Sequence, residues 1–247
     1  MAGKQRLDTI LVARGLAESR AKAQALALAG LVFSGERRLD KPGQMLATDT
    51  PLECRGRDHP YVSRGGVKLA HALDHFAIDP SGAIALDIGA STGGFTDVLL
   101  RRGAAKVYAV DVGHGQLDWR LRQDPRVVVR ERCNARHLTS AEIAESPSLI
   151  VCDASFIGLE TVLPAALALA APGASLVALI KPQFEVGKGR VGKGGVVRDP
   201  ALHEEVCARI AAWLAAQPGW SVRGIAESPI RGPEGNIEFL IAAERRQ

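Results

Sequence analysis

The chain of 247 residues is long enough for one large domain, or for a medium domain joined to a small one. Its hydrophobic content of 47% and charged content of 23% are those of an ordinary globular protein. No apolar run approaches the roughly 20 residues that cross a bilayer, and the N-terminal segment has no apolar core of signal-peptide length. We therefore expect a cytoplasmic protein that does not associate with a membrane.

Positive charge is concentrated at the start of the chain. Residues 1–68 hold 12 Lys and Arg against 7 Asp and Glu, a net charge of +5, whereas residues 69–247 hold 19 against 20. This asymmetry predicts a small basic module joined to a nearly neutral one, although solvated surface charge alone would give the same excess.

Cysteine and histidine spacing indicates neither a disulfide framework nor a metal site. The four cysteines form no C-x-x-C pair and are expected to be free thiols in a reducing compartment. His71 and His75 are four residues apart on an expected helix, but no third ligand is close in the sequence. We therefore predict that no metal is bound.

The first part of the chain predicts a compact α+β module over residues 1–58. Ser19 is a suitable N-cap for a helix, and Gly15 and Gly30 are suitable helix ends. The expected elements are helices 6–14 and 20–29 and strands 32–33 and 50–55. Residues 59–67 are expected to form a linker.

From residue 68 to residue 247, strands and helices alternate. The expected strands are 83–87, 106–110, 126–130, 148–152, 174–180, 220–226 and 236–243. The expected helices are 66–76, 95–102, 115–122, 139–145, 159–170 and 201–216. This order predicts an α/β fold with a mostly parallel seven-stranded sheet covered on both faces. In such sheets ligands bind at the carboxyl ends of the strands.

A glycine-rich loop follows the first of these strands. Asp87 closes the strand and is followed by Gly89, Gly93 and Gly94, where glycine lets the backbone approach a ligand and turn into a helix. The spacing is not the G-x-G-x-x-G dinucleotide fingerprint. Asp-x-Gly-x-x-x-Gly-Gly is instead the first motif of Rossmann-like methyltransferases, so we predict S-adenosylmethionine as the cofactor. An ordinary strand-to-helix turn is the alternative.

A second acid, Asp111, closes the next strand, where it suits the ribose hydroxyls of an adenosine ligand. Acids at two consecutive strand ends are a stronger indication than either acid alone. The predicted cofactor-binding residues are Asp87, Gly89, Ala90, Ser91, Thr92, Gly93, Gly94, Phe95, Asp111 and Asn134.

Two charged residues close the fourth and fifth strands of this series. Asp153 ends one, and Lys181 ends the other within Leu-Ile-Lys-Pro-Gln-Phe-Glu. Lysine is almost never fully buried without a partner, and Asp153 on the neighbouring strand could be that partner. A purely structural salt bridge is the alternative to a functional pair.

A basic loop over residues 187–194 nearly matches the P-loop of nucleotide triphosphatases. Its last position is Gly194 rather than Ser or Thr, so the magnesium ligand is missing, and no helix follows at once. We interpret the segment as a cationic loop that touches phosphates or closes over a substrate.

Taken together, these motifs resemble the TlyA family, the hemolysin-A-named group of FtsJ-like rRNA methyltransferases, over nearly the whole chain. The first part resembles the small RNA-binding domain shared with a ribosomal small-subunit protein. Its matching motifs are Arg6-Leu-Asp, Ser19-Arg20-Ala-Lys22, Gly30-Leu-Val32 and Lys41-Pro-Gly43. The FtsJ-like motifs are Ser63-Arg-Gly-Gly-Val-Lys68, the loop 87–96, Asp153-Ala-Ser-Phe and Lys181-Pro-Gln-Phe-Glu185.

The resemblance implies a catalytic tetrad. FtsJ-like ribose methyltransferases carry Lys-Asp-Lys-Glu, which corresponds here to Lys68, Asp153, Lys181 and Glu238. We expect Glu238 in the last strand, with Glu234 as a close alternative. A hydroxyl is a weak nucleophile and needs a base, so Lys181 is assigned as the base and the other three as positioning and electrostatic groups. Which lysine is neutral stays open.

The resemblance also implies ribosomal RNA or ribosomal subunits as the substrate and cytidine as the methylated nucleoside. The candidate RNA-binding residues are Arg6, Arg20, Lys22, Lys41 and Arg64. One alternative is a non-catalytic ribosome-assembly factor that binds RNA. The other is a pore-forming hemolysin, for which we find neither a secretion signal nor a membrane-active segment.

Overall fold

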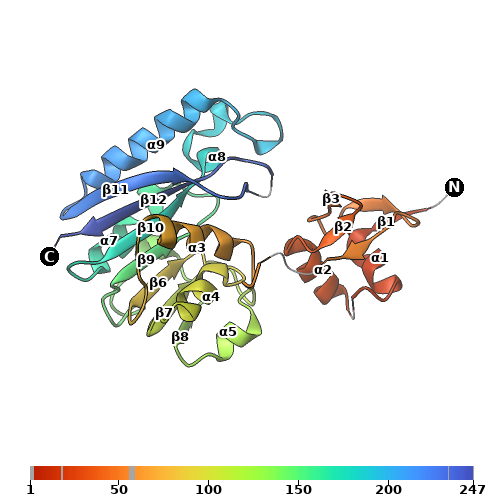
Figure 1. Ribbon diagram of the computed structural model, residues 1–247, viewed down its shortest axis with the longest axis horizontal. Helices are drawn as coiled ribbons and strands as arrows, with labels where there is room; N and C mark the ends of the chain where they lie inside the picture. The colour runs from red at the N-terminus through yellow and green to blue at the C-terminus, as the bar shows by residue number, and fades with distance from the viewer. Residues whose placement is uncertain (1–2, 18, 56–58, 233, 247) are drawn as a thin grey trace. The chain divides into compact units, whose positions relative to one another are not determined.

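The computed structural model describes residues 3–17, 19–55, 59–232 and 234–246. The chain separates into two units, Met1–Pro60 and Tyr61–Gln247, shown in Figure 1. Most of the segment expected as a linker falls in the second unit, because Val62 is buried in that unit's core and helix α3 begins at Gly65.

The small unit is built on two helices and short strands. Helix α1 (Leu7–Ala13) packs against α2 (Arg20–Leu28), and Ser19 Oγ caps α2 by accepting a hydrogen bond from the Lys22 N–H at 3.2 Å. The strand pairs are β1 (Lys4–Arg6) with β4 (Met45–Ala47), and β2 (Val32–Ser34) with both β3 (Arg37–Arg38) and β5 (Glu53–Cys54). Its buried apolar side chains include Leu7, Leu11, Ala23, Ala27, Val32 and Leu39.

The large unit contains a seven-stranded sheet in the order β11-β12-β10-β9-β6-β7-β8. Its strands are β6 (Ile84–Ile88), β7 (Lys106–Val110), β8 (Val127–Arg130), β9 (Leu149–Cys152), β10 (Ser175–Ile180), β11 (Trp220–Glu227) and β12 (Phe239–Arg245). Strand β12 runs antiparallel to both of its neighbours, β10 and β11, and the other four pairings are parallel, so the predicted mostly parallel sheet is confirmed. All four residues of β9 are buried, as expected for a strand covered on both faces.

Helices cover both faces of this sheet (Figure 1). One face packs against α3 (Gly65–His75), α4 (Gly94–Arg101) and α5 (Trp119–Gln123) through residues such as Leu69 and Leu99. The other packs against the short helix η1 (Ala135–His137), α6 (Leu159–Val162), α7 (Pro164–Leu169) and α9 (Pro200–Ala215) through Leu163 and Ile210. Helices α8 (Pro182–Glu185), η2 (Lys188–Arg190) and η3 (Lys193–Gly195) follow β10. No helix in the described ranges has the length and apolar character of a membrane span.

Three sequence-based boundaries are wrong for identifiable reasons. The helix expected over 139–145 is a single turn closed locally, because Glu142 Oε2 accepts hydrogen bonds from the N–H and Oγ1 of Thr139. The helix expected over 159–170 divides before Pro164, which cannot donate a backbone hydrogen bond. The helix expected over 115–122 begins only at Trp119, where Asp118 caps it by accepting from the Arg120 N–H.

Candidate active site

Asp153 and Lys181 meet because they follow adjacent parallel strands. The pairing of Ala178 with Cys152 brings the carboxyl ends of β10 and β9 together. Lys181 Nζ lies 2.6 Å from Asp153 Oδ1 and donates to the Asp153 carbonyl at 3.0 Å and to Ser155 Oγ at 2.9 Å. The expected ion pair is therefore present, and Ser155 is an additional partner of the lysine.

Glu238 and Lys68 form a second ion pair beside the first. Phe239 pairs with Ile180 in the antiparallel register, which brings the preceding Glu238 level with Lys181. Glu238 thus lies one residue before β12, not inside the strand as expected from the sequence. Lys68 projects from α3, and its Nζ is 2.5 Å from Glu238 Oε2, with side-chain exposures of 8% and 2%. The nearby Glu234 is exposed.

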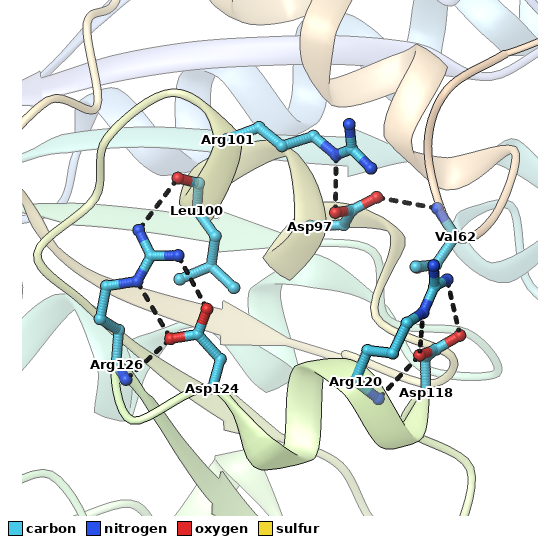
Figure 2. Close-up of polar contacts among 8 residues, drawn as sticks. All are labelled: Val62, Asp97, Leu100, Arg101, Asp118, Arg120, Asp124 and Arg126. Atoms are coloured by element: carbon cyan, nitrogen blue, oxygen red, sulfur yellow. Dashed lines mark hydrogen bonds and ion pairs between the residues drawn. The ribbon is translucent and has the colours of Figure 1, made fainter.

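The helix that carries Lys68 is anchored on the helix that follows the glycine-rich loop. Figure 2 shows Asp97 of α4 between Val62 and Arg101. Its carboxylate accepts hydrogen bonds from the Val62 N–H at 2.9 Å and from Arg101 Nε at 2.8 Å. A Cβ added to Gly94 would lie 2.9 Å from the nitrogen of Gly66, so glycine allows the two helix starts to touch. The start of α4, which directly follows the glycine-rich loop, therefore also helps to position the helix that carries Lys68.

A cavity of about 480 Å³ opens beside the first ion pair, within the range of small-molecule sites. Its lining includes one member of the predicted tetrad, Asp153, and four predicted cofactor residues, which are Gly89, Ser91, Asp111 and Asn134. The rest of the lining is Ile88, Val110, Val112, Gly113, Gln116, Cys133, Ala135, Arg136, Ala154, Ser155, Phe156, Ile157 and Val162.

Local hydrogen bonds orient the polar groups of this cavity. Asp111 Oδ2 accepts from the Ser91 N–H at 2.8 Å, and its Oδ1 accepts from the Gly113 N–H at 2.7 Å. Asn134 Oδ1 accepts from the backbone N–H of Arg136 at 3.1 Å. Gly89 has a φ of +80°, and a Cβ there would lie 2.9 Å from the Ala154 Cα. The loop after β6 therefore lies directly against the loop after β9, which carries Asp153.

Six predicted cofactor residues are not among the lining residues of this cavity. They are Asp87, Ala90, Thr92, Gly93, Gly94 and Phe95. Asp87 is 0% exposed, and its Oδ2 accepts a hydrogen bond from Thr96 Oγ1 at 2.7 Å while its Oδ1 has no partner among the described residues. Burial raises the pKa of Asp87 to about 7.

Replacing Asp87 with asparagine is expected to stabilise the protein in a pH-dependent way. A carboxyl whose folded pKa is near 7 and whose unfolded pKa is about 3.9 lowers the free energy of unfolding as pH rises between those values. Asp87→Asn should therefore raise that free energy at pH 8, by up to about 4 kcal/mol, and have little effect at pH 4. Urea unfolding at the two pH values measures the difference.

Asp97→Asn is the matched control, because that carboxylate is also buried but holds two hydrogen-bond donors. It should lower stability at both pH values. If the difference in unfolding free energy between Asp87→Asn and wild type were the same at pH 4 and at pH 8, burial would not raise the pKa of Asp87 as argued.

The structure adds cavity residues that sequence reasoning missed. Gln116 Oε1 accepts from Ser91 Oγ at 3.2 Å, and the Phe156 side chain is 89% exposed. Ser91 and Phe156 have φ values of +47° and +65°, backbone strain of the kind that concentrates at functional sites. Phe156 could have been found, because it ends the Asp153-Ala-Ser-Phe motif.

The predicted RNA-binding residues fall in both units. In the small unit, Arg6 and Arg20 each bond to the buried carboxylate of Asp8, and Lys22 and Lys41 are exposed. Arg64 belongs to the large unit, where it precedes α3 and its Nη2 donates to the Arg231 carbonyl at 3.4 Å.

Comparisons with known proteins agree with this architecture. The FtsJ-like methyltransferase model matches residues 61–245, and the S4 domain model matches residues 5–50. The chain is 50% identical to the 16S/23S rRNA (cytidine-2′-O)-methyltransferase TlyA of Mycobacterium tuberculosis, over 98% of this chain and 90% of that protein. It is 44% identical to hemolysin A of Brachyspira hyodysenteriae, over 95% and 98%. A solved structure of a candidate hemolysin from Streptococcus thermophilus superposes with a TM-score of 0.77 at 44% identity, covering 100% of this chain and 90% of that one.

Proposed function

The chain belongs to the FtsJ-like methyltransferase family and carries an S4 domain, and from that premise we propose that it methylates a ribose 2′-hydroxyl of cytidine in ribosomal RNA. The observation that carries the proposal is the presence of two ion pairs beside the cavity at the strand ends: Lys181–Asp153, whose carboxylate lines the cavity, and the buried pair Lys68–Glu238. Two relatives named TlyA are described as methyltransferases for cytidine 2′-hydroxyls of rRNA, which supports the same substrate. We place the protein in the cytoplasm, where ribosomes are.

S-adenosylmethionine fits the cavity by its donor set. The cofactor supplies an electrophilic methyl group on a sulfonium, and its adenosine has two ribose hydroxyls. The Asp111 carboxylate, fixed by two backbone N–H groups, would accept hydrogen bonds from those hydroxyls. Gly89 lets the backbone approach the ligand, while Val110, Ala135 and Val162 offer apolar surface to its base.

Methyl transfer to oxygen requires an aligned nucleophile and removal of its proton. In this proposal the 2′-hydroxyl would lie against Lys181 and give its proton to Lys181 Nζ. The bound cofactor would supply the methyl group, its sulfur–methyl bond breaking as the oxygen–methyl bond forms, and would leave as the neutral thioether. Lysine accepts a proton only in its neutral form. Asp153 and Ser155 hold Lys181 Nζ in place. The neighbouring Lys68–Glu238 ion pair places one positive and one negative charge at fixed positions beside that nitrogen.

Phe156 provides an aromatic surface at the cavity for the base of the target nucleotide. Its ring is 89% exposed and lies 5.0 Å from the ring of Phe184, centroid to centroid. Specific recognition of RNA uses unstacked bases placed on such rings. Phe156→Ala is expected to lower kcat/KM for RNA by about tenfold to a hundredfold.

The affinity of Phe156→Ala for S-adenosylmethionine, measured by calorimetry, should change far less than kcat/KM. Phe156→Tyr keeps a ring and should recover most of the activity. Equal losses in the alanine and tyrosine variants would contradict a stacking role.

Incubation of the protein with radiolabelled S-adenosylmethionine and unmodified ribosomal subunits tests the proposed function. Label should appear in rRNA in the presence of wild type and not in its absence. If the protein binds the subunits and the cofactor without transferring label, the reading as a non-catalytic assembly factor is correct instead.

A further inference from the structure

The small unit contains a fully buried carboxylate that holds two exposed arginines. Asp8 is 0% exposed in the first turn of α1, and its backbone N–H donates to the Pro42 carbonyl at 3.0 Å. The side chains of Arg6 and Arg20 that meet it remain 43% and 60% exposed. The buried carboxylate of Asp8 therefore pairs with two guanidinium groups that remain in contact with solvent.

The two oxygens of Asp8 accept hydrogen bonds from the side chains of four residues, one of which is Thr9, whose Oγ1 lies 3.4 Å from Oδ1. Arg6 binds both, with Nε 3.0 Å from Oδ1 and Nη2 2.8 Å from Oδ2. Oδ2 also accepts from Arg20 Nε at 3.1 Å and from Gln24 Nε2 at 2.9 Å. The hydrogen bonds from the Arg6 guanidinium hold the pKa of the Asp8 carboxyl far below its usual range, so it is ionised at neutral pH. The guanidinium groups of Arg6 and Arg20 thus both donate to the same atom, Asp8 Oδ2.

Each guanidinium keeps donors for another ligand. A guanidinium carries five N–H donors, and Arg6 and Arg20 use only some of theirs on Asp8. A Cβ added to Gly43 would lie 3.1 Å from Arg6 Nη1, so the glycine leaves room for the Arg6 fork. With one carboxylate against two cations, the cluster retains positive charge at the surface. Paired guanidinium groups of this kind suit phosphate oxygens.

We propose that Asp8 is a positioning residue for RNA binding, which holds Arg6 and Arg20 together as a preformed site for the phosphates of the RNA backbone. The proposal rests on the proposed function, because it takes rRNA as the ligand of the small unit. Its physical basis is that two long side chains fixed before binding lose less conformational entropy when they bind.

Asp8→Asn distinguishes a positioning role from a simple charge effect, because the two predict opposite changes in RNA affinity. Removing a negative charge from an RNA-binding surface should strengthen binding if charge alone matters. An asparagine NH₂ group would instead face the arginine donors, release them and weaken binding, by about tenfold. Affinity is measured for the full chain with unmodified ribosomal subunits. Glu36→Gln is the matched control in the same unit, since its side chain is 95% exposed, and it should leave affinity unchanged or slightly raised.

Two further variants keep the test decisive if Asp8→Asn folds poorly. The double variant Arg6→Lys with Arg20→Lys changes exposed side chains and preserves net charge, yet should lose affinity because lysine lacks the guanidinium fork. In an Arg6→Ala, Arg20→Ala background, Asp8→Asn should have little further effect. Circular dichroism reports folding of each variant, and an unchanged affinity for S-adenosylmethionine shows that the large unit is unaffected.

Equal or tighter RNA binding by Asp8→Asn, or full affinity in the double lysine variant, would overturn the positioning role while leaving the proposed function intact. Absence of subunit binding by wild type would overturn the rRNA substrate itself, and the positioning role with it.

Discussion

Replacing Lys181 with alanine is expected to lower kcat for methyl transfer by about a thousandfold while S-adenosylmethionine still binds. The proposed base is lost, and general base catalysis contributes about a hundredfold to ten-thousandfold. Lys181 is not among the residues that line the cavity, so the dissociation constant of the cofactor should change little. Single-turnover transfer to rRNA and calorimetry with the cofactor measure the two quantities.

Lys181→Arg distinguishes two roles for Lys181, that of a base that accepts a proton and that of a fixed positive charge. Arginine keeps a cation beside Asp153 but cannot accept a proton near neutral pH. We expect this variant to be as inactive as the alanine variant. Substantial activity with arginine would show that the lysine acts through its charge, and the base would then have to be another group.

Breaking the Lys68–Glu238 pair is expected to cost about 3–5 kcal/mol of the free energy of unfolding of the large unit. Lys68→Met leaves a carboxylate with 2% exposure and without its cation, and an uncompensated buried charge is strongly destabilising. The double variant Lys68→Met, Glu238→Gln removes both charges and should recover most of that loss. Urea unfolding followed by circular dichroism gives the values.

Arg190→Met is the control, because Arg190 pairs with Glu205 in a setting where both side chains are about half exposed. Its unfolding midpoint should hardly change, since exposed pairs contribute little. Two results would show that the Lys68–Glu238 pair does not stabilise the large unit as argued. One is a Lys68→Met variant as stable as the Arg190→Met control, and the other is a double variant no more stable than Lys68→Met.

Sequence reasoning located the parts of the site that depend on strand ends. A parallel sheet brings the carboxyl ends of its strands to one edge, so Asp111, Asp153 and Lys181 could be assigned to that edge from periodicity alone. Lys68 and Glu238 could not, because one comes from a helix and the other precedes an antiparallel strand. Their placement came from family resemblance.

Contacts between segments far apart in the chain were beyond sequence reasoning. Nothing near Asp8 indicates that Arg20 and Gln24 reach its carboxylate, since that contact depends on how α1 packs against α2. The cavity lining likewise draws Gln116 and Phe156 from two separate loops and Arg136 from the short helix η1. Loop conformation is set by tertiary contacts and local hydrogen bonds, which a pattern of apolar residues does not encode.

The local errors have the same physical origin. The expected helix over 139–145 has a suitable composition, but Thr139 and Glu142 satisfy each other and close one turn. Side chains of this type compete with helical backbone hydrogen bonds. Asp87, predicted to bind the cofactor from its place in the motif, is buried against Thr96 and is not among the lining residues of the cavity, so its contact with the cofactor stays a prediction.

The chemical identity of the methylated atom tests transfer to ribose most directly. Unmodified ribosomal subunits are incubated with the protein and S-adenosylmethionine, and the rRNA is digested to nucleosides for mass spectrometry. We predict 2′-O-methylcytidine with wild type and none with Lys181→Ala. A methyl group found on a base, or 2′-O-methylcytidine formed equally by both proteins, would contradict the proposed reaction.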